Sequence, residues 1–300
     1  MVSRHHSHQR LARNLILNAS IRKQGTLMTA NQGAAAIAEK LIDGLVTGSP
    51  DQVRSLFSGP ADIDDPFAGR QIDGGFERMV RNWGPAKLAT IKSVEMEHCT
   101  VGAEGRFVGA EFHLELDKGG EDKRLDVVAV LEMAGDRIGR SRLYYRRARI
   151  DGVQHVRNRI LDDVLVMETG APILEPYQKA LHSADTEGML ATFDKAGIFN
   201  GHGEHTDLRQ GLGMGIYADR ESMRGALQQM FDLTGEAMGK TVGEITLEKM
   251  NGFTDGRNYV LEFNIIDPNH PTNRVHAGVA VYEVGDNGLI KEARIFDEAW

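Results

Sequence analysis

The sequence has a single cysteine, no long apolar run and no excess of positive charge, and each of these absences excludes a class of protein. With Cys99 alone the chain can form no intramolecular disulfide and no CxxC metal site, which favours a reducing compartment. No segment approaches the roughly 20 apolar residues of a membrane-spanning helix. The net charge of −8 is unfavourable for wrapping nucleic acid, which needs a basic face. We therefore expect a cytoplasmic protein whose partners include neither membrane nor nucleic acid.

Acidic residues are absent from the first 38 positions, where arginines and a cluster of histidines are found instead. Such a segment is typical of a targeting peptide, of a disordered arm, or of upstream sequence translated ahead of a true start at Met28. We favour a disordered or misassigned extension over residues 1–34 and interpret the histidines as a solvated tail.

The C-terminal half of the sequence repeats the N-terminal half. The stretch Glu104–Met133 aligns without a gap onto Asp255–Val284, with eight identities where chance gives roughly two. Upstream, Ser49–Asp64 aligns with Asp185–Asn200, and the second copy then carries about fifteen extra residues centred on Gly201–Tyr217. The chain is therefore a tandem duplication. The identical pairs are Gly105/Gly256, Arg106/Arg257, Glu111/Glu262, Phe112/Phe263, Val128/Val279, Ala129/Ala280, Val130/Val281 and Glu132/Glu283.

Both copies show one order of expected elements. An amphipathic helix (36–46 or 174–183) precedes a short, polar-capped helix that ends near Phe57 or Phe193, and a short strand and a further helix follow. The remainder alternates with a period of two residues, as antiparallel strands do. Helices followed by a mainly antiparallel sheet predict an α+β fold. We expect domains at residues 35–150 and 173–300, with a linker over 151–172 that contains a helix at 156–165.

The stretch GSPDQVRSLFSGPADIDDPFAGRQIDG, residues 48–74, contains an apolar strand that ends in Asp-Pro-aromatic-x-Gly and leads into a helix. In this motif and in the order of its elements, each copy resembles the nuclear transport factor 2-like superfamily, especially the SnoaL-like polyketide cyclases and the ketosteroid isomerases. The resemblance implies two cone-shaped domains, in which a curved sheet surrounds helices and an apolar interior. It also implies outer sheet faces that could pair, here as an intramolecular pseudo-dimer along Glu111 and Glu262, or in a homo-oligomer.

The resemblance implies a general base at Asp65, directly before the proline of the motif, whereas the second copy has Gly201 at this position. The tyrosine that helps form the isomerases' oxyanion hole matches Leu41 in the first copy and Tyr177 in the second. The second acid of that hole is replaced by alanine in both copies. Because neither copy carries the full set, steroid isomerisation itself is disfavoured and altered chemistry is expected.

Asp65 is the first candidate for catalysis, because a carboxylate in an apolar cone loses hydration, which raises its pKa towards that of a useful base. The alternative is that Asp65 belongs to a solvated turn, which aspartate favours. On the closing strand, alternation and the family alignment direct Tyr145 and Arg147 inward. Tyr145 would then donate a hydrogen bond to an enolate oxygen, or simply cap the core with its hydroxyl in water.

Phe67 and Trp83 are predicted to form flat apolar walls for a ring-containing ligand, or to be plain core residues. Alternation places His113 on the outer face of its strand, as a surface or interface residue and not a base.

In the second copy, Tyr177, Tyr282, His276 and Asp297 are expected to share one interior, with Asp297 loosely matching the late-strand aspartate of the cyclases. His202 and His205 in the inserted segment could ligate zinc with Glu204, but the spacing is not HExxH, and we favour a lid over the second pocket with no metal.

These residues predict a cofactor-independent acid–base enzyme. It would act by proton abstraction on a small apolar, aromatic or polycyclic carbonyl or phenolic substrate, as an isomerase, dehydratase, cyclase or carbon–carbon lyase. Asp65, Tyr145, Tyr177 and Asp297 are the catalytic candidates, and Phe67, Trp83, Arg147, His202 and Tyr282 the substrate-binding ones. The alternative is a non-catalytic small-molecule-binding or scaffolding protein with degenerate copies of the domain.

Overall fold

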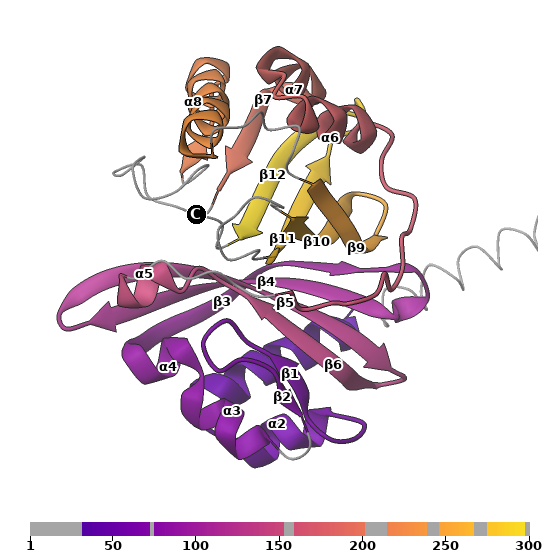
Figure 1. The fold of residues 1–300 in the computed structure, drawn as a ribbon. Coiled ribbons are helices and arrows are strands. Elements are labelled where there is room, and N and C mark those ends of the chain that lie inside the picture. The colour runs from indigo at the N-terminus through magenta and orange to yellow at the C-terminus, as the bar shows by residue number, and fades with distance from the viewer. Residues whose placement is uncertain are drawn as a thin grey trace, which may run out of the picture.

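The computed structural model of the chain describes residues 32–72, 75–152, 159–201, 215–238, 246–266 and 275–297. Within these ranges the chain forms two successive units with the same order of helices and strands (Figure 1). Residues 1–31, which hold nearly all of the expected N-terminal extension, lie outside the described part. No helix within the described ranges is long and apolar enough to cross a membrane.

The first unit begins with a helix over residues 32–46 and continues with α2 (Pro50–Leu56). The Ser49 side chain caps α2 by accepting a hydrogen bond from the Gln52 backbone N–H, and Pro50 occupies the first turn, where its missing N–H costs nothing. The following elements are β1 (Asp62–Asp64), β2 (Gln71–Ile72), α3 (Phe76–Asn82), α4 (Gly84–Leu88), β3 (Thr90–Val101), a 3-10 turn (Ala103–Gly105), β4 (Phe107–Lys118), β5 (Glu121–Ala134), β6 (Arg137–Tyr144) and α5 (Ala148–Asp151).

The second unit repeats this order with one long helix in place of α3 and α4, and its described residues contain no counterpart of the 3-10 turn or of α5. The Asp185 side chain caps its second helix by accepting a hydrogen bond from the Gly188 N–H, as Ser49 does in the first unit. The elements are α6 (Leu174–His182), α7 (Thr186–Thr192), β7 (Phe193–Asn200), β8 (Ile216–Tyr217), α8 (Arg220–Met238), β9 (Thr246–Thr254), β10 (Asn258–Ile266), β11 (Val275–Val284) and β12 (Ile290–Asp297).

Each unit builds one six-stranded sheet, in the orders β2-β1-β6-β5-β4-β3 and β8-β7-β12-β11-β10-β9. Within the described strands, the neighbours pair antiparallel except for β1 with β6 and β7 with β12, which are parallel. The parallel pairs bring the end of the first short strand beside the end of the last long one. The expected α+β fold with two tandem, mainly antiparallel units is confirmed.

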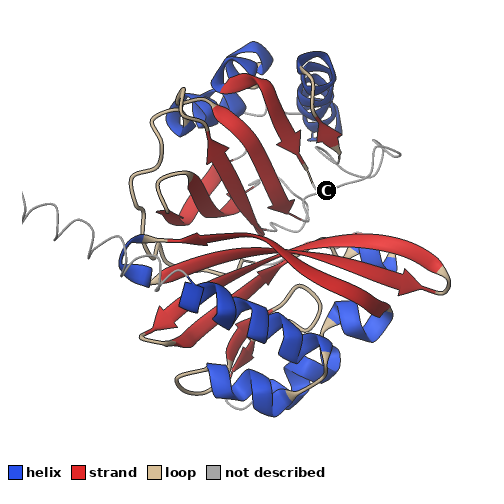
Figure 2. Ribbon diagram, turned by 180° about the vertical axis from the view of Figure 1, so that it is seen from behind, coloured by secondary structure: helices blue, strands red, loops and turns tan. Residues whose placement is uncertain are grey.

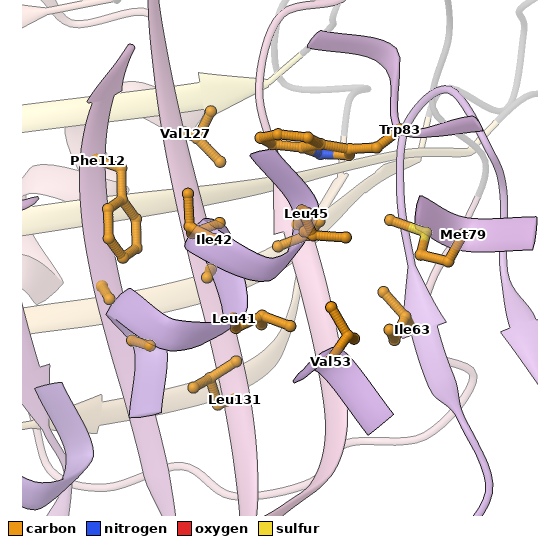
Figure 3. Packing of buried hydrophobic residues seen from close by; sticks show 14 of the residues in the cluster. Leu41, Ile42, Leu45, Val53, Ile63, Met79, Trp83, Phe112, Val127 and Leu131 are labelled. Carbon is orange, nitrogen blue, oxygen red and sulfur yellow. The ribbon is translucent and has the colours of Figure 1, made fainter. Parts of the chain in front are cut away.

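The inner face of the first sheet packs on the helices of its own unit and forms the first core. As alternation predicts, Val108, Ala110, Phe112 and Leu114 of β4 all belong to this core and are at most 2% exposed. Figure 3 shows Leu41 and Leu45 of the first helix in one cluster with Phe112, Val127 and Leu131 of the sheet. The second sheet packs on α6, α7 and α8 in the same way.

The outer faces of the two sheets lie against one another, and the helices that pack on their inner faces lie at opposite ends of the molecule (Figure 2). The Phe107 and Phe253 rings stack across this contact with their centroids 5.6 Å apart. The apolar cluster between the sheets consists of Phe107, Val128, Val130 and Tyr144 from the first unit, Ile160 from the linker, and Phe253, Val260, Ala277, Val279, Val281 and Phe296 from the second.

The connecting helix expected over 156–165 is wrong for its described part, since residues 159–171 contain no helix. Their backbone instead pairs with the edge of β9: the Leu165 N–H donates to the Met250 carbonyl, and the Gly252 N–H to that of Val166. The buried residues Ile160 and Leu161 anchor the segment beside the sheets. Pairing with an open strand edge satisfies the same backbone groups that a helix would have satisfied internally.

Candidate functional site

Asp65 follows β1 directly and opens the turn that leads to β2. Its Oδ1 accepts hydrogen bonds from the backbone N–H groups of Phe67, at 2.9 Å, and Ala68, at 2.7 Å. These bonds are typical of an aspartate that starts a turn, which is the alternative that the sequence offered for Asp65. The turn is not solvated, however, because Asp65 is only 1% exposed. A buried carboxylate therefore stands at the end of the short strand of the first unit.

Tyr145 lies beside Asp65 because β6, which it follows, runs parallel to β1. Its hydroxyl donates a hydrogen bond of 2.8 Å to Asp65 Oδ2, and the tyrosine is 3% exposed. The two backbone donors and the phenol hydroxyl thus contact both oxygens of the carboxylate. We call Asp65 and Tyr145 the Asp–Tyr pair.

Phe67 and Arg147 cover the pair on the side nearer to solvent. Phe67 is partly exposed, and the Arg147 guanidinium carbon stands 4.3 Å from the centre of its ring. Arg147 Nε also donates to Asp151 Oδ2 at 2.9 Å. The exposed Lys87 ammonium lies 5.4 Å from the same ring centre. Two cations thus flank one aromatic ring next to the buried carboxylate.

Trp83 lies in the break between α3 and α4. Pro85 causes the break, because proline fits the first turn of α4 but cannot continue α3. The adjoining Gly84 has no room for a side chain, since a Cβ there would stand 3.0 Å from both the Tyr145 hydroxyl and the Phe67 Cβ. Trp83 itself is fully buried in the first core.

The structure thus brings the predicted residues of the first copy into one region. Asp65, Tyr145 and Phe67 are in direct contact, Arg147 stacks on Phe67, and Trp83 is joined to the group through Gly84. Sequence reasoning missed Gly84 and Lys87. The Gly-Pro pair after Trp83 was the available signal for Gly84, since it is an unfavourable combination inside a helix. His113 lies on the outer face, where its ring contacts Glu115 and Asp126.

In the second unit, Tyr177 and Tyr282 are buried together, with ring centres 5.3 Å apart in an edge-to-face arrangement. Burial raises the pKa of Tyr282 well above its ordinary value, and a hydrogen bond with Tyr177 raises it further. Tyr282 is therefore a neutral phenol over the physiological range. Such a pair can donate hydrogen bonds but supplies no carboxylate.

The remaining candidates of the second copy are placed only in part. Asp297 ends β12 and pairs in register with Gly278, which is the backbone position that Tyr145 has after β6. Gly201 takes the place of Asp65. His202, Glu204 and His205 lie outside the described residues, so the lid and zinc interpretations of the insertion stay predictions. The insertion ends in β8, which pairs with β7 as β2 does with β1.

Among the described residues, no group of three or more histidine, cysteine, aspartate or glutamate side chains is arranged to hold a metal ion. Cys99 is unsuited to nucleophilic chemistry, because burial raises the pKa of its thiol to about 11.

The chain matches no protein-family model, and a comparison with curated proteins gives no match. Solved structures similar to it include an LEH-like epoxide hydrolase from M. tuberculosis, which is 19% identical with a TM-score of 0.31 and covers 41% of this chain and 89% of its own. Another is an NTF2-like protein of unknown function from Cytophaga hutchinsonii, 14% identical with a TM-score of 0.29, covering 44% of this chain and 94% of its own. A third is the epoxide hydrolase/cyclase-like enzyme SalBIII of pyran ring formation in salinomycin, 15% identical with a TM-score of 0.29, covering 42% and 87%.

Proposed function

We propose that the first unit is a cofactor-independent acid–base enzyme. Its substrate would be a small, largely apolar carbonyl or phenolic compound that contains a ring, and the reaction an isomerisation, dehydration, cyclisation or carbon–carbon cleavage that begins with removal of a proton. The observation that carries this proposal is the Asp–Tyr pair: a buried carboxylate and a phenol hydroxyl, 80 residues apart in sequence, joined by a 2.8 Å hydrogen bond.

The pair can move one proton without a cofactor. Asp65 takes the proton from an acidic C–H group of the substrate, the C–H electron pair becomes the new carbon–carbon double bond of an enolate, and the negative charge passes to the carbonyl oxygen. Once protonated, Asp65 no longer needs the Tyr145 proton and can itself donate to the phenol oxygen. The Tyr145 O–H then turns to the enolate oxygen, where its hydrogen bond stabilises the charge that has developed.

This order of proton transfers refines the role expected for Tyr145. A phenol has one proton to donate, and in the structure that proton is directed at Asp65. Donation to the substrate therefore follows proton transfer and does not precede it, so that the hydrogen bond is made mainly to the charged intermediate. Interactions that strengthen as the reaction proceeds are those that accelerate it.

The proposal is tested by solvent-deuterium incorporation, measured by mass spectrometry, into enolisable bicyclic ketones and lignin-like phenolics. Asp65→Asn is the informative variant, because the amide oxygen can still accept from the Phe67 and Ala68 N–H groups while the basic carboxylate is lost. Asp64→Asn, one residue earlier, is the matched control. We expect exchange in the wild type and in Asp64→Asn but not in Asp65→Asn. Exchange that survives in Asp65→Asn would exclude Asp65 as the base.

A second candidate function concerns the second unit alone. Gly201 at the position of Asp65 removes the carboxylate, and the outer face of this unit packs on the first. We propose that the second unit serves as a structural partner or binds a small molecule without turning it over. Replacing Tyr282 by phenylalanine should then leave the exchange rate unchanged.

A further inference from the structure

The indole nitrogen of Trp83 is a buried hydrogen-bond donor that no acceptor among the described residues satisfies. The residue is fully buried within the first core, and its Nε1 is one of few side-chain polar atoms in the described part of the chain that are both buried and unpaired. Figure 3 shows the Trp83 ring reaching into this core from the segment between α3 and α4. Buried polar groups in folded proteins are nearly always hydrogen-bonded, so an exception calls for an explanation.

The way Trp83 is positioned argues against chance. In the second unit, α8 is a continuous helix over the region where the first unit has α3, the break and α4. Breaking a helix gives up internal hydrogen bonds, and proline is the costly residue that enforces the break. Phenylalanine or leucine would fill the same apolar space without an unpaired N–H. The first unit thus keeps two unfavourable features at Trp83: the break in the helix and the unpaired indole N–H.

The break also joins Trp83 to the Asp–Tyr pair. The next residue, Gly84, approaches the Tyr145 hydroxyl so closely that a methyl group would stand 3.0 Å from it. A ligand that reaches the Asp–Tyr pair would therefore lie beside the segment that carries Trp83. Because an indole N–H can only donate, the group that it receives must be an acceptor, such as a carbonyl or ether oxygen.

We propose that the Trp83 N–H binds an acceptor oxygen of the ligand and thereby selects ring-containing carbonyl compounds over hydrocarbons of the same shape. The inference rests on the proposed function for the location of the site, but it is a statement about binding and does not require turnover. Trp83 is then more than a flat wall: it fixes which end of the ligand faces the Asp–Tyr pair.

The test uses two probes that differ at the acceptor alone: 2-tetralone, a bicyclic ketone, and 2-methylenetetralin, in which a methylene group replaces the oxygen. Trp83 and Trp300 are the two tryptophans of the chain, so the Trp300→Phe variant leaves Trp83 as the sole indole fluorophore, and its emission reports binding. For Trp83→Phe, which retains an aromatic ring but lacks the N–H, isothermal titration calorimetry measures the affinities of the same two probes.

We expect the protein with Trp83 to bind the ketone about two- to twelve-fold more tightly than the hydrocarbon, the range of one neutral hydrogen bond. In Trp83→Phe the two affinities should become equal. A purely structural role would weaken both probes alike and leave their ratio unchanged, and that result would overturn the inference, as would a failure of the wild type to bind either probe. If Trp83→Phe makes the two affinities equal but the wild type shows no exchange activity, the proposed enzyme is contradicted and the binding role of Trp83 stands. If the wild type shows exchange activity but Trp83→Phe leaves the ratio of the two affinities unchanged, the binding role is contradicted and the proposed enzyme stands.

Discussion

Arg294 of the second sheet and Glu111 of the first form a buried ion pair, with Arg294 Nε donating to Glu111 Oε2 at 2.6 Å and Nη2 to Oε1 at 3.1 Å. The repeat supplies the reciprocal pair: Arg142 donates to both oxygens of Glu262, at 2.6 and 2.7 Å. Glu111 and Glu262 are corresponding positions of the two copies, and so are the two arginines. The contact between the sheets is therefore close to two-fold symmetric, although one chain makes both halves.

Loss of one partner of a buried pair is expected to be costly here. In Glu111→Leu the buried Arg294 guanidinium keeps only the partly exposed Glu292, 2.9 Å from its Nη1, as a counter-charge, which should lower the free energy of unfolding by up to about 3–5 kcal/mol. In Glu111→Leu/Arg294→Leu both charges are gone, so most of that loss should be recovered. Urea unfolding followed by circular dichroism measures both. A double variant no more stable than the single one would show that the ion pair itself, and not the unpaired charge, governs the stability.

Gly84→Ala should weaken the Asp–Tyr pair although neither member of the pair is substituted. The added methyl would stand 3.0 Å from both the Tyr145 hydroxyl and the Phe67 Cβ, so one of these neighbours has to shift, and we expect a loss of about 1–3 kcal/mol of stability together with reduced exchange activity. Gly225→Ala is the matched control, since its methyl in α8 would meet no atom within 4 Å and should stabilise by up to about 1 kcal/mol. Equal effects of the two substitutions on the exchange rate would refute the tight contact at Gly84.

Much of the fold could be predicted because its signals are local. The period-two pattern of β4 gave its inner face, and the polar residues Ser49 and Asp185 marked the beginnings of α2 and α7. Because the chain is duplicated, each of these elements could be recognised in both copies. The helix expected over 156–165 failed because the free edge of β9, distant in sequence, offered the linker other hydrogen-bond partners.

The site was less predictable, for a physical reason. Asp65 and Tyr145 could be proposed separately, but their direct hydrogen bond depends on the parallel pairing of β1 with β6, which no pattern of period two encodes. The position of Trp83 depends on the glycine and the proline directly after it, which separate α3 from α4. That the duplicated copies differ at these points could be read from the sequence, whereas what the difference does to the geometry could not.

His113 makes part of the stability depend on pH near neutrality. Burial lowers its pKa, but hydrogen bonds with Glu115 and Asp126 raise it by more, so that the pKa in the folded protein lies above the ordinary value. A raised histidine pKa stabilises the fold fully below about pH 6.5, the value in an unfolded chain, and this contribution is lost as the pH rises through the folded pKa.

We therefore expect the urea midpoint of the wild type to fall between about pH 6 and 8.5 and that of His113→Gln to fall less. His98→Gln, on β3, controls for the loss of a histidine elsewhere on this sheet. A wild-type midpoint that rises over this range would contradict the direction of the shift.

Tyr145→Phe separates the two uses of the phenol proton. If the hydroxyl stabilises the enolate only after Asp65 has taken the proton, its removal should lower kcat by about 10²-fold, as the loss of one oxyanion donor does, and leave KM nearly unchanged. Steady-state kinetics of the two proteins measure both quantities. A change in KM alone would instead assign Tyr145 to ground-state binding of the substrate, and the order of proton transfers proposed for the Asp–Tyr pair would have to be abandoned.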